Sequence, residues 1–88
     1  MKKCVEVKLN EIETLKNFVN EITKFDFPIN ARSLNRNADY DAKSIMALLA
    51  LDLSNPIEIV AFIPNHKEAS DFENVVNKYM VTKWKRLN

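Results

Sequence analysis

The residues that most often perform catalysis or hold metals are scarce in this chain. His66 is the only histidine and Cys4 the only cysteine. An imidazole that works as a base or a nucleophile needs a group that orients it or binds the substrate, and zinc needs a cluster of ligands. The neighbours of His66 are Asn65 and Lys67, which supply neither, and one cysteine cannot form an internal disulfide. We therefore expect His66 on the surface, no metal or cofactor, and a protein that is not an enzyme.

Glycine is absent from all 88 residues, which excludes further chemistry. The phosphate-binding loop of nucleotide hydrolases and the dinucleotide-binding turn both need glycine, because only glycine lets the backbone approach a phosphate closely. Any turn that requires a positive φ angle must use another residue, and asparagine is the usual second choice. The length predicts one small domain, 1–88, without room for a large enclosed active site.

The charge balance also limits the possible partners. Thirteen basic and twelve acidic side chains leave a net charge of +1, which makes nucleic acid an unlikely partner. The longest apolar run, 45–51, is far too short to span a membrane, and no apolar segment of a secretory signal follows the first lysines. We therefore expect a cytoplasmic protein that binds other proteins and no membrane.

The C-terminal segment 82–88 is a short basic tail. It contains Lys83, Trp84, Lys85 and Arg86. Cations around an aromatic ring could contact nucleic acid, lipid or an acidic protein, although a short charged tail is more often simply solvated. A small nucleic-acid-binding domain that uses this tail therefore stays open as an alternative.

The first half of the chain predicts a strand followed by a helix. Val5, Val7 and Leu9 alternate with charged residues, as in a half-buried strand. Apolar residues then recur at intervals of three and four, which predicts one buried face of a helix. They are Ile12, Leu15, Phe18, Val19 and Ile22. Asn10 and Glu13 match a capping box at the start of this helix.

The rest of the chain predicts two strands, a short helix, a third strand and a last helix. The strands are expected at 29–34, 38–41 and 57–63, with a turn at 35–37. Ser44 can cap the short helix, while Asn65 and Glu68 form a second capping box before the last helix. The order β-α-β-β-α-β-α predicts an α+β fold, in which three helices cover one face of a four-stranded antiparallel sheet.

The stretch 41–53, with the sequence Ala42-Lys43-Ser44-Ile45-Met46 near its start, resembles the regulatory-serine region of the HPr family. HPr is the small phosphocarrier of the bacterial sugar phosphotransferase system. The likeness covers roughly residues 3–80. It includes Phe18-Val19-Asn20-Glu21, Phe25 and the strand that begins Ile57-Glu58-Ile59. The resemblance implies an open-faced β-sandwich with the element order given above.

The chain departs from this family where the phosphate would be carried. HPr proteins have a histidine and an arginine at the start of the first helix, and those positions correspond here to Glu11 and Glu13. A phosphocarrier needs a neutral imidazole to attack phosphorus and cations to stabilise the phosphate, whereas two carboxylates repel it. We therefore predict that histidine phosphotransfer is lost, and that the two glutamates simply suit the helix dipole. A working phosphocarrier with a relocated nucleophile, His66 or a carboxylate, stays open.

The resemblance implies two further sites near the second helix. Ser44 corresponds to a serine that a dedicated kinase phosphorylates in some bacteria, although it is more simply an N-cap. Lys43, Ile45, Met46 and Leu49 correspond to a surface that docks partner proteins, although the apolar residues among them could equally be core. The implied partners are phosphotransferase-system or transcription-regulatory proteins. The sequence thus favours a regulatory or protein-interaction module.

Overall fold

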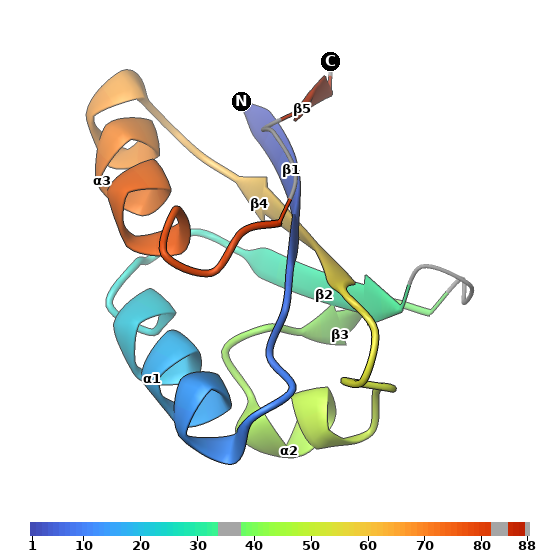
Figure 1. Cartoon of the computed structure of the whole chain (residues 1–88). Coiled ribbons are helices and arrows are strands. Elements are labelled where there is room, and N and C mark those ends of the chain that lie inside the picture. The colour runs from blue at the N-terminus through green and yellow to red at the C-terminus, as the bar shows by residue number, and fades with distance from the viewer. Residues whose placement is uncertain (34–37, 82–84, 88) are drawn as a thin grey trace.

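The computed structural model describes residues 1–33, 38–81 and 85–87. The elements are β1 Lys2–Val7, α1 Ile12–Ile22, β2 Ile29–Ser33, β3 Tyr40–Asp41, α2 Ile45–Leu49, β4 Ile57–Phe62, α3 His66–Val76 and β5 Lys85–Leu87. The strands form one antiparallel sheet in the order β3-β2-β4-β1-β5, and the helices lie on one side of it (Figure 1). The predicted α+β fold and its four antiparallel strands are confirmed, and β5 adds a short strand at one edge.

The centre of the sheet is the pairing of β1 with β4. The two strands run antiparallel over six residue pairs, from Lys2 opposite Phe62 to Val7 opposite Ile57. The predicted alternation holds, because Val5, Val7 and Ile59 face the helices and are fully buried. The β-branched residues of β4 therefore form the floor of the core.

The helices cover this floor with aromatic and aliphatic side chains. Phe18 of α1 and Phe72 of α3 are completely buried. The ring of Phe72 meets the rings of Phe25 and Phe27 edge-on, at centroid distances of 5.5 and 5.6 Å. Helix α2 contributes one buried residue, Leu48. Within the described ranges, no helix is long and apolar enough to cross a membrane.

The other face of the sheet is partly closed as well. Cys4 and Val60 lie side by side in the β1–β4 pairing, on the face away from the helices, and are only 2% and 4% exposed. The backbone of β5 pairs with β1 from Lys2 opposite Leu87 to Cys4 opposite Lys85. Of the predicted basic tail, 85–87 therefore form a strand, while 82–84 and 88 lie outside the described residues.

The start of α1 differs from its prediction. The N-cap is Glu11, without a side-chain capping bond, so the capping box assigned to Asn10 and Glu13 is wrong. Ile12, predicted to face the core, is 54% exposed. It is the first residue of the helix, and helical side chains lean toward the N-terminus, so its side chain projects beyond the core.

The second predicted capping box, Asn65 and Glu68, is confirmed for the bond that the Asn65 side chain accepts. The Asn65 side chain accepts a hydrogen bond from the amide of Glu68 at 2.9 Å, at the start of α3. The strands are shorter than predicted, since β3 begins at Tyr40 and β4 ends at Phe62. No described residue has a positive φ angle, so the described turns do not need asparagine in place of glycine.

Candidate functional site

Ser44 occupies the N-cap position of α2, as predicted. Its backbone is extended, and its Oγ accepts a hydrogen bond from the amide of Ala47 at 3.2 Å. The side chain is half-buried. The hydroxyl thus already satisfies one of the free amides of the first turn, which accounts for a serine here on structural grounds alone.

Lys43 is held by its neighbours rather than extended into solvent. Its amide donates to Oδ1 of Asp41 at 2.9 Å, and its ammonium group donates to the carbonyl oxygen of Phe25. Its charge is thereby directed toward the connection between α1 and β2. Ile45 is half-buried and packs against the core. The docking roles of Lys43 and Ile45 stay predictions.

Met46 and Leu49 are the exposed residues of α2. They are 78% and 51% exposed, and their spacing of three residues places them on one face of the helix. Helices α1 and α2 are in contact, and the beginning of α1 lies at the same end of the molecule as α2 (Figure 1). Ile12, the exposed first residue of α1, therefore lies at the same end of the molecule as Met46 and Leu49. We call these three residues the apolar patch.

Glu11 and Glu13 flank Ile12 at the start of α1. Both are exposed, and neither carboxylate makes a hydrogen bond or an ion pair with a described residue. Glu13 stands in the first turn, where a negative charge stabilises the helix dipole. The two carboxylates therefore face solvent beside the apolar patch.

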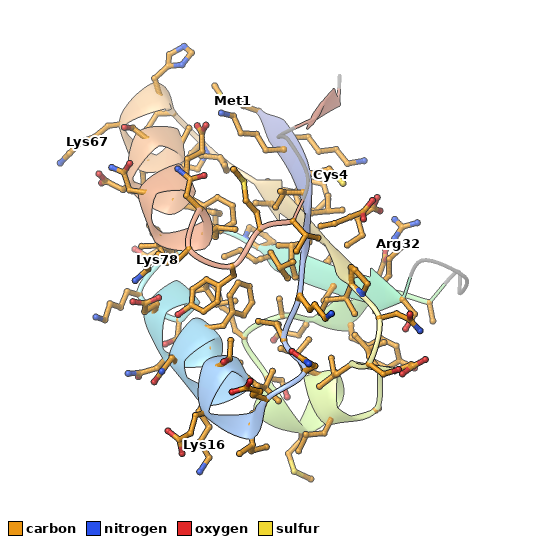
Figure 2. The ribbon with its side chains drawn as sticks, in the orientation of Figure 1. Met1, Cys4, Lys16, Arg32, Lys67 and Lys78 are labelled. Atoms are coloured by element: carbon orange, nitrogen blue, oxygen red, sulfur yellow. The ribbon has the colours of Figure 1, made fainter. Side chains whose placement is uncertain are left out.

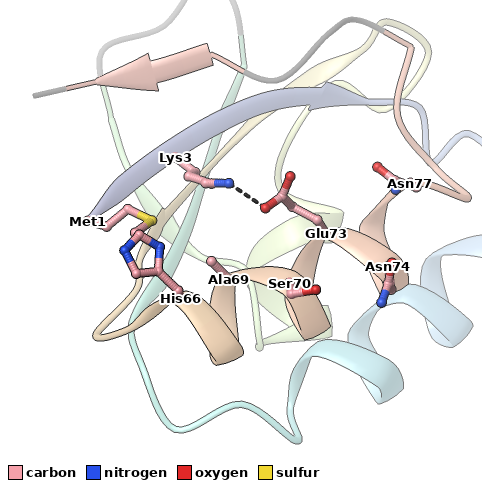
Figure 3. A pocket seen from close by; sticks show the side chains of 8 residues that line it. All are labelled: Met1, Lys3, His66, Ala69, Ser70, Glu73, Asn74 and Asn77. Atoms are coloured by element: carbon pink, nitrogen blue, oxygen red, sulfur yellow. Dashed lines mark hydrogen bonds and ion pairs between the residues drawn. The ribbon is translucent and has the colours of Figure 1, made fainter.

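His66 lies far from this site. It is the first residue of α3, exposed as predicted, at the end of the molecule opposite to α2 (Figure 2 labels the adjacent Lys67 and, at the other end, Lys16). It lines an open groove of about 240 Å³ whose wall carries an ion pair between Lys3 and Glu73 (Figure 3). The described residues include no group of three or more side chains suited to hold a metal.

The sequence left open whether Met46 and Leu49 are core or surface, and both are exposed, whereas it assigned the exposed Ile12 to the buried face. The periodicity of α1 assigned Ile12 to the buried face, because its spacing to Leu15 and Val19 fits that face. The signal that could have corrected this is its place at the helix start between two glutamates, where the adjoining positions favour solvent.

Comparison with known proteins supports the fold. No protein-family model and no curated protein matches the chain. Among solved structures it is similar to the crystal structure of HPr-C-His from Thermoanaerobacter tengcongensis. The TM-score is 0.63, the sequence identity 23%, and the match covers 88% of this chain and 89% of that one. The chain therefore has an HPr-like fold, as the resemblance implied.

Proposed function

We propose that this HPr-like chain is a regulatory protein-interaction module that docks its partner on the apolar patch, beside Ser44. The observation that carries the proposal is the exposure of Ile12, Met46 and Leu49 at one end of the molecule. A small protein gains stability by burying such side chains, so a group of three in solvent is typical of a contact surface. Methionine adapts readily to the shape of a partner.

The proposal includes the loss of histidine phosphotransfer. The start of α1, where the HPr resemblance places the phosphorylated histidine and its arginine, carries Glu11 and Glu13. The single histidine of the sequence, His66, begins α3 at the opposite end. Carboxylates beside a phosphoryl group raise its energy, and no imidazole stands there to accept it.

Ser44 is the proposed point of regulation. A phosphate on its Oγ would stand at the start of α2, next to Met46, and would replace the present bond to the Ala47 amide. It would add a charge of about −1.5 to −2 to the rim of the docking surface. The proposed partners are phosphotransferase-system or transcription-regulatory proteins, with a serine kinase as the modifying enzyme.

Docking is tested by comparing exposed apolar residues in two places. The chain is tagged in its own cells, and the proteins that co-purify are quantified for the wild type, for Met46→Ser with Leu49→Ser, and for Val81→Ser. Val81 is 50% exposed and lies outside the patch, so it is a matched control. We expect the double variant to lose its partners and Val81→Ser to keep them. Equal retention by both variants would contradict docking at the patch.

Phosphorylation is tested separately by mass spectrometry. Incubation with enzyme I and phosphoenolpyruvate should leave the mass unchanged, while an ordinary HPr in the same reaction gains one phosphate. An acid-labile phosphate on this chain would contradict the loss of phosphotransfer, and His66→Ala would show whether His66 carries it. Incubation with HPr kinase and ATP should add one phosphate that Ser44→Ala abolishes. An unmodified Ser44 would refute regulation by this route.

A further inference from the structure

The charges that flank the apolar patch are predominantly negative. Glu11 and Glu13 stand directly before and after Ile12; both are exposed, and their carboxylates have no hydrogen bond or ion pair to a described residue. Asp52, three residues after Leu49, is also exposed. Its carboxylate accepts hydrogen bonds from Ser54 and Asn55. Carboxylates therefore adjoin both helices of the patch.

Cations near the patch are fewer and partly engaged. Lys43, just before α2, directs its ammonium group to the carbonyl oxygen of Phe25. Lys16 is exposed one turn beyond Ile12 on α1 (Figure 2) and is the cation nearest to the patch along that helix. At the start of α1, two carboxylates, those of Glu11 and Glu13, are therefore accompanied by one lysine within the helix, Lys16.

Several other carboxylates of the molecule are neutralised by partners. Glu73 is paired with Lys3, and Glu21 with Lys78. By contrast, the carboxylates of Glu11 and Glu13 are exposed and have no partner among the described residues, so they are available to a cation from outside. An apolar centre with a charged rim is the usual anatomy of a protein interface.

We infer that the partner presents an apolar pocket flanked by arginine or lysine side chains, which meet Glu11 and Glu13 when the apolar patch is docked. The inference rests on the proposed function, since it names the kind of partner that the same surface binds. A membrane with anionic lipids would be repelled by these carboxylates. A second copy would set its own Glu11 and Glu13 against these carboxylates, with Lys16 the one lysine within α1, so the partner we infer is a different protein.

The expected role of the glutamates is selectivity and fast encounter. Exposed ion pairs at the rim of an interface contribute little affinity, but complementary charges steer the encounter and exclude partners of the same sign. Because such charges are screened by salt, the preference for a basic partner should weaken as the ionic strength rises.

The test uses two synthetic amphipathic helical peptides as probes. They share one leucine and phenylalanine stripe, flanked by arginine in the first peptide and by glutamate in the second. Each is titrated into isotope-labelled protein while the amide chemical shifts are followed by NMR. We expect the arginine peptide to shift the amides of Ile12, Met46 and Leu49, with an affinity about tenfold higher than that of the glutamate peptide at low salt.

Charge-reversal variants identify the carboxylates responsible. Glu11→Lys with Glu13→Lys should abolish or invert the preference. Glu68→Lys with Asp71→Lys makes the same change of charge in α3, away from the patch, and should leave the preference unchanged. Circular dichroism checks that each variant is folded.

The outcomes separate this inference from the proposed function. Binding of both peptides at the patch with equal affinity would overturn the basic-partner inference and leave docking intact. The basic-partner inference is likewise overturned if Glu68→Lys with Asp71→Lys removes the preference for the arginine peptide as completely as Glu11→Lys with Glu13→Lys does. If neither peptide shifts the patch, or if Met46→Ser with Leu49→Ser leaves the binding unchanged, docking at the patch itself is overturned.

Discussion

The region around α3 and the region around α2 are built in opposite ways. Helix α3 has a side-chain cap from Asn65, buries Phe72 and Val76 completely, and is tied to β1 by the pair between Lys3 and Glu73. Helix α2 also has a side-chain cap, from Ser44, but it is less than half as long and has one buried residue, Leu48. The neighbouring start of α1 has no side-chain cap.

This difference separates stability from recognition. Around α3, the apolar side chains are in the core, and Glu73 and Glu21 have ion-pair partners. Around α2, Met46 and Leu49 are in solvent, as are the free carboxylates of α1. A surface whose side chains contribute little to folding can change without loss of the fold, which suits it to select a partner.

The largest expected effect tests where the stability resides. Phe72→Ala should lower the free energy of unfolding by about 3–5 kcal/mol, because it removes a fully buried ring that packs on Phe25 and Phe27. Met46→Ala should change it by less than about 0.5 kcal/mol, since that side chain is 78% exposed. Both are measured by urea denaturation followed by circular dichroism.

Two further variants serve as controls for this contrast. Leu48→Ala should cost about 2–5 kcal/mol, because Leu48 is the buried anchor of α2. Val81→Ala should be nearly neutral, as expected for another exposed apolar residue. A large loss from Met46→Ala would show that Met46 belongs to the core, and the contrast between the two regions would fail.

The helix starts provide the next test. Asn65→Ala should destabilise the protein by about 1 kcal/mol, because the amide of Glu68 loses its acceptor. Glu11→Asp should stabilise it by up to about 1 kcal/mol, since aspartate is a good N-cap and keeps the charge. The same denaturation experiment measures both. If Glu11→Asp is neutral while Asn65→Ala is costly, the start of α1 is already satisfied by other means.

The sequence predicted the elements whose causes are local. Ser44 and Asn65 cap helices because each side chain reaches an amide three residues on, a geometry that depends on little else. Asn10 fits the same pattern but is not the cap. Leu9 is buried, Lys8 donates a backbone bond to Tyr79, and the backbone is still extended at Glu11, so α1 begins later. That contact comes from far along the chain, and a local pattern cannot contain it.

The site could be predicted only in part for the same reason. The spacing of Met46 and Leu49 fits a core face as well as a surface, and the choice depends on Leu48 being the residue that points inward. The ammonium group of Lys43 bonds to the carbonyl of Phe25, eighteen positions earlier, which no motif indicates. The contact of α1 with α2, which brings Ile12 to the patch, is likewise a product of tertiary packing.

The last test concerns the polar link between α1 and the residues Lys78 and Tyr79, which follow α3. Glu21 accepts hydrogen bonds from Lys78 at 2.5 Å and from the Tyr79 hydroxyl at 2.7 Å. The bonds from Lys78 and Tyr79 lower the pKa of Glu21. Burial, together with the bond to Glu21, raises the pKa of Tyr79 to about 12. The link therefore favours a charged Glu21 and a protonated Tyr79.

The raised pKa of Tyr79 makes the stability of the protein depend on pH. Unfolded Tyr79 loses its proton near its ordinary pKa of 10, whereas the folded residue keeps it to about pH 12. The contribution of Tyr79 is therefore complete below pH 10 and declines as the pH rises to about 12, because the unfolded state binds fewer protons there. The free energy of unfolding of Tyr79→Phe, measured over the same pH range as that of the wild type, should lack this decline.

Glu21→Gln separates the two causes of the Tyr79 shift. It removes the charge of the hydrogen-bond acceptor and keeps the packing, so an absorbance titration should show a lower pKa of Tyr79 that still lies above 10, because burial is the larger cause. A pKa of Tyr79 unchanged in Glu21→Gln would mean that the hydroxyl does not bond to Glu21 in solution. Tyr79 would then be joined to α1 by packing alone, with its ring against the ring of Phe18 at 5.2 Å, and the pair between Lys78 and Glu21 would be the polar link that remains.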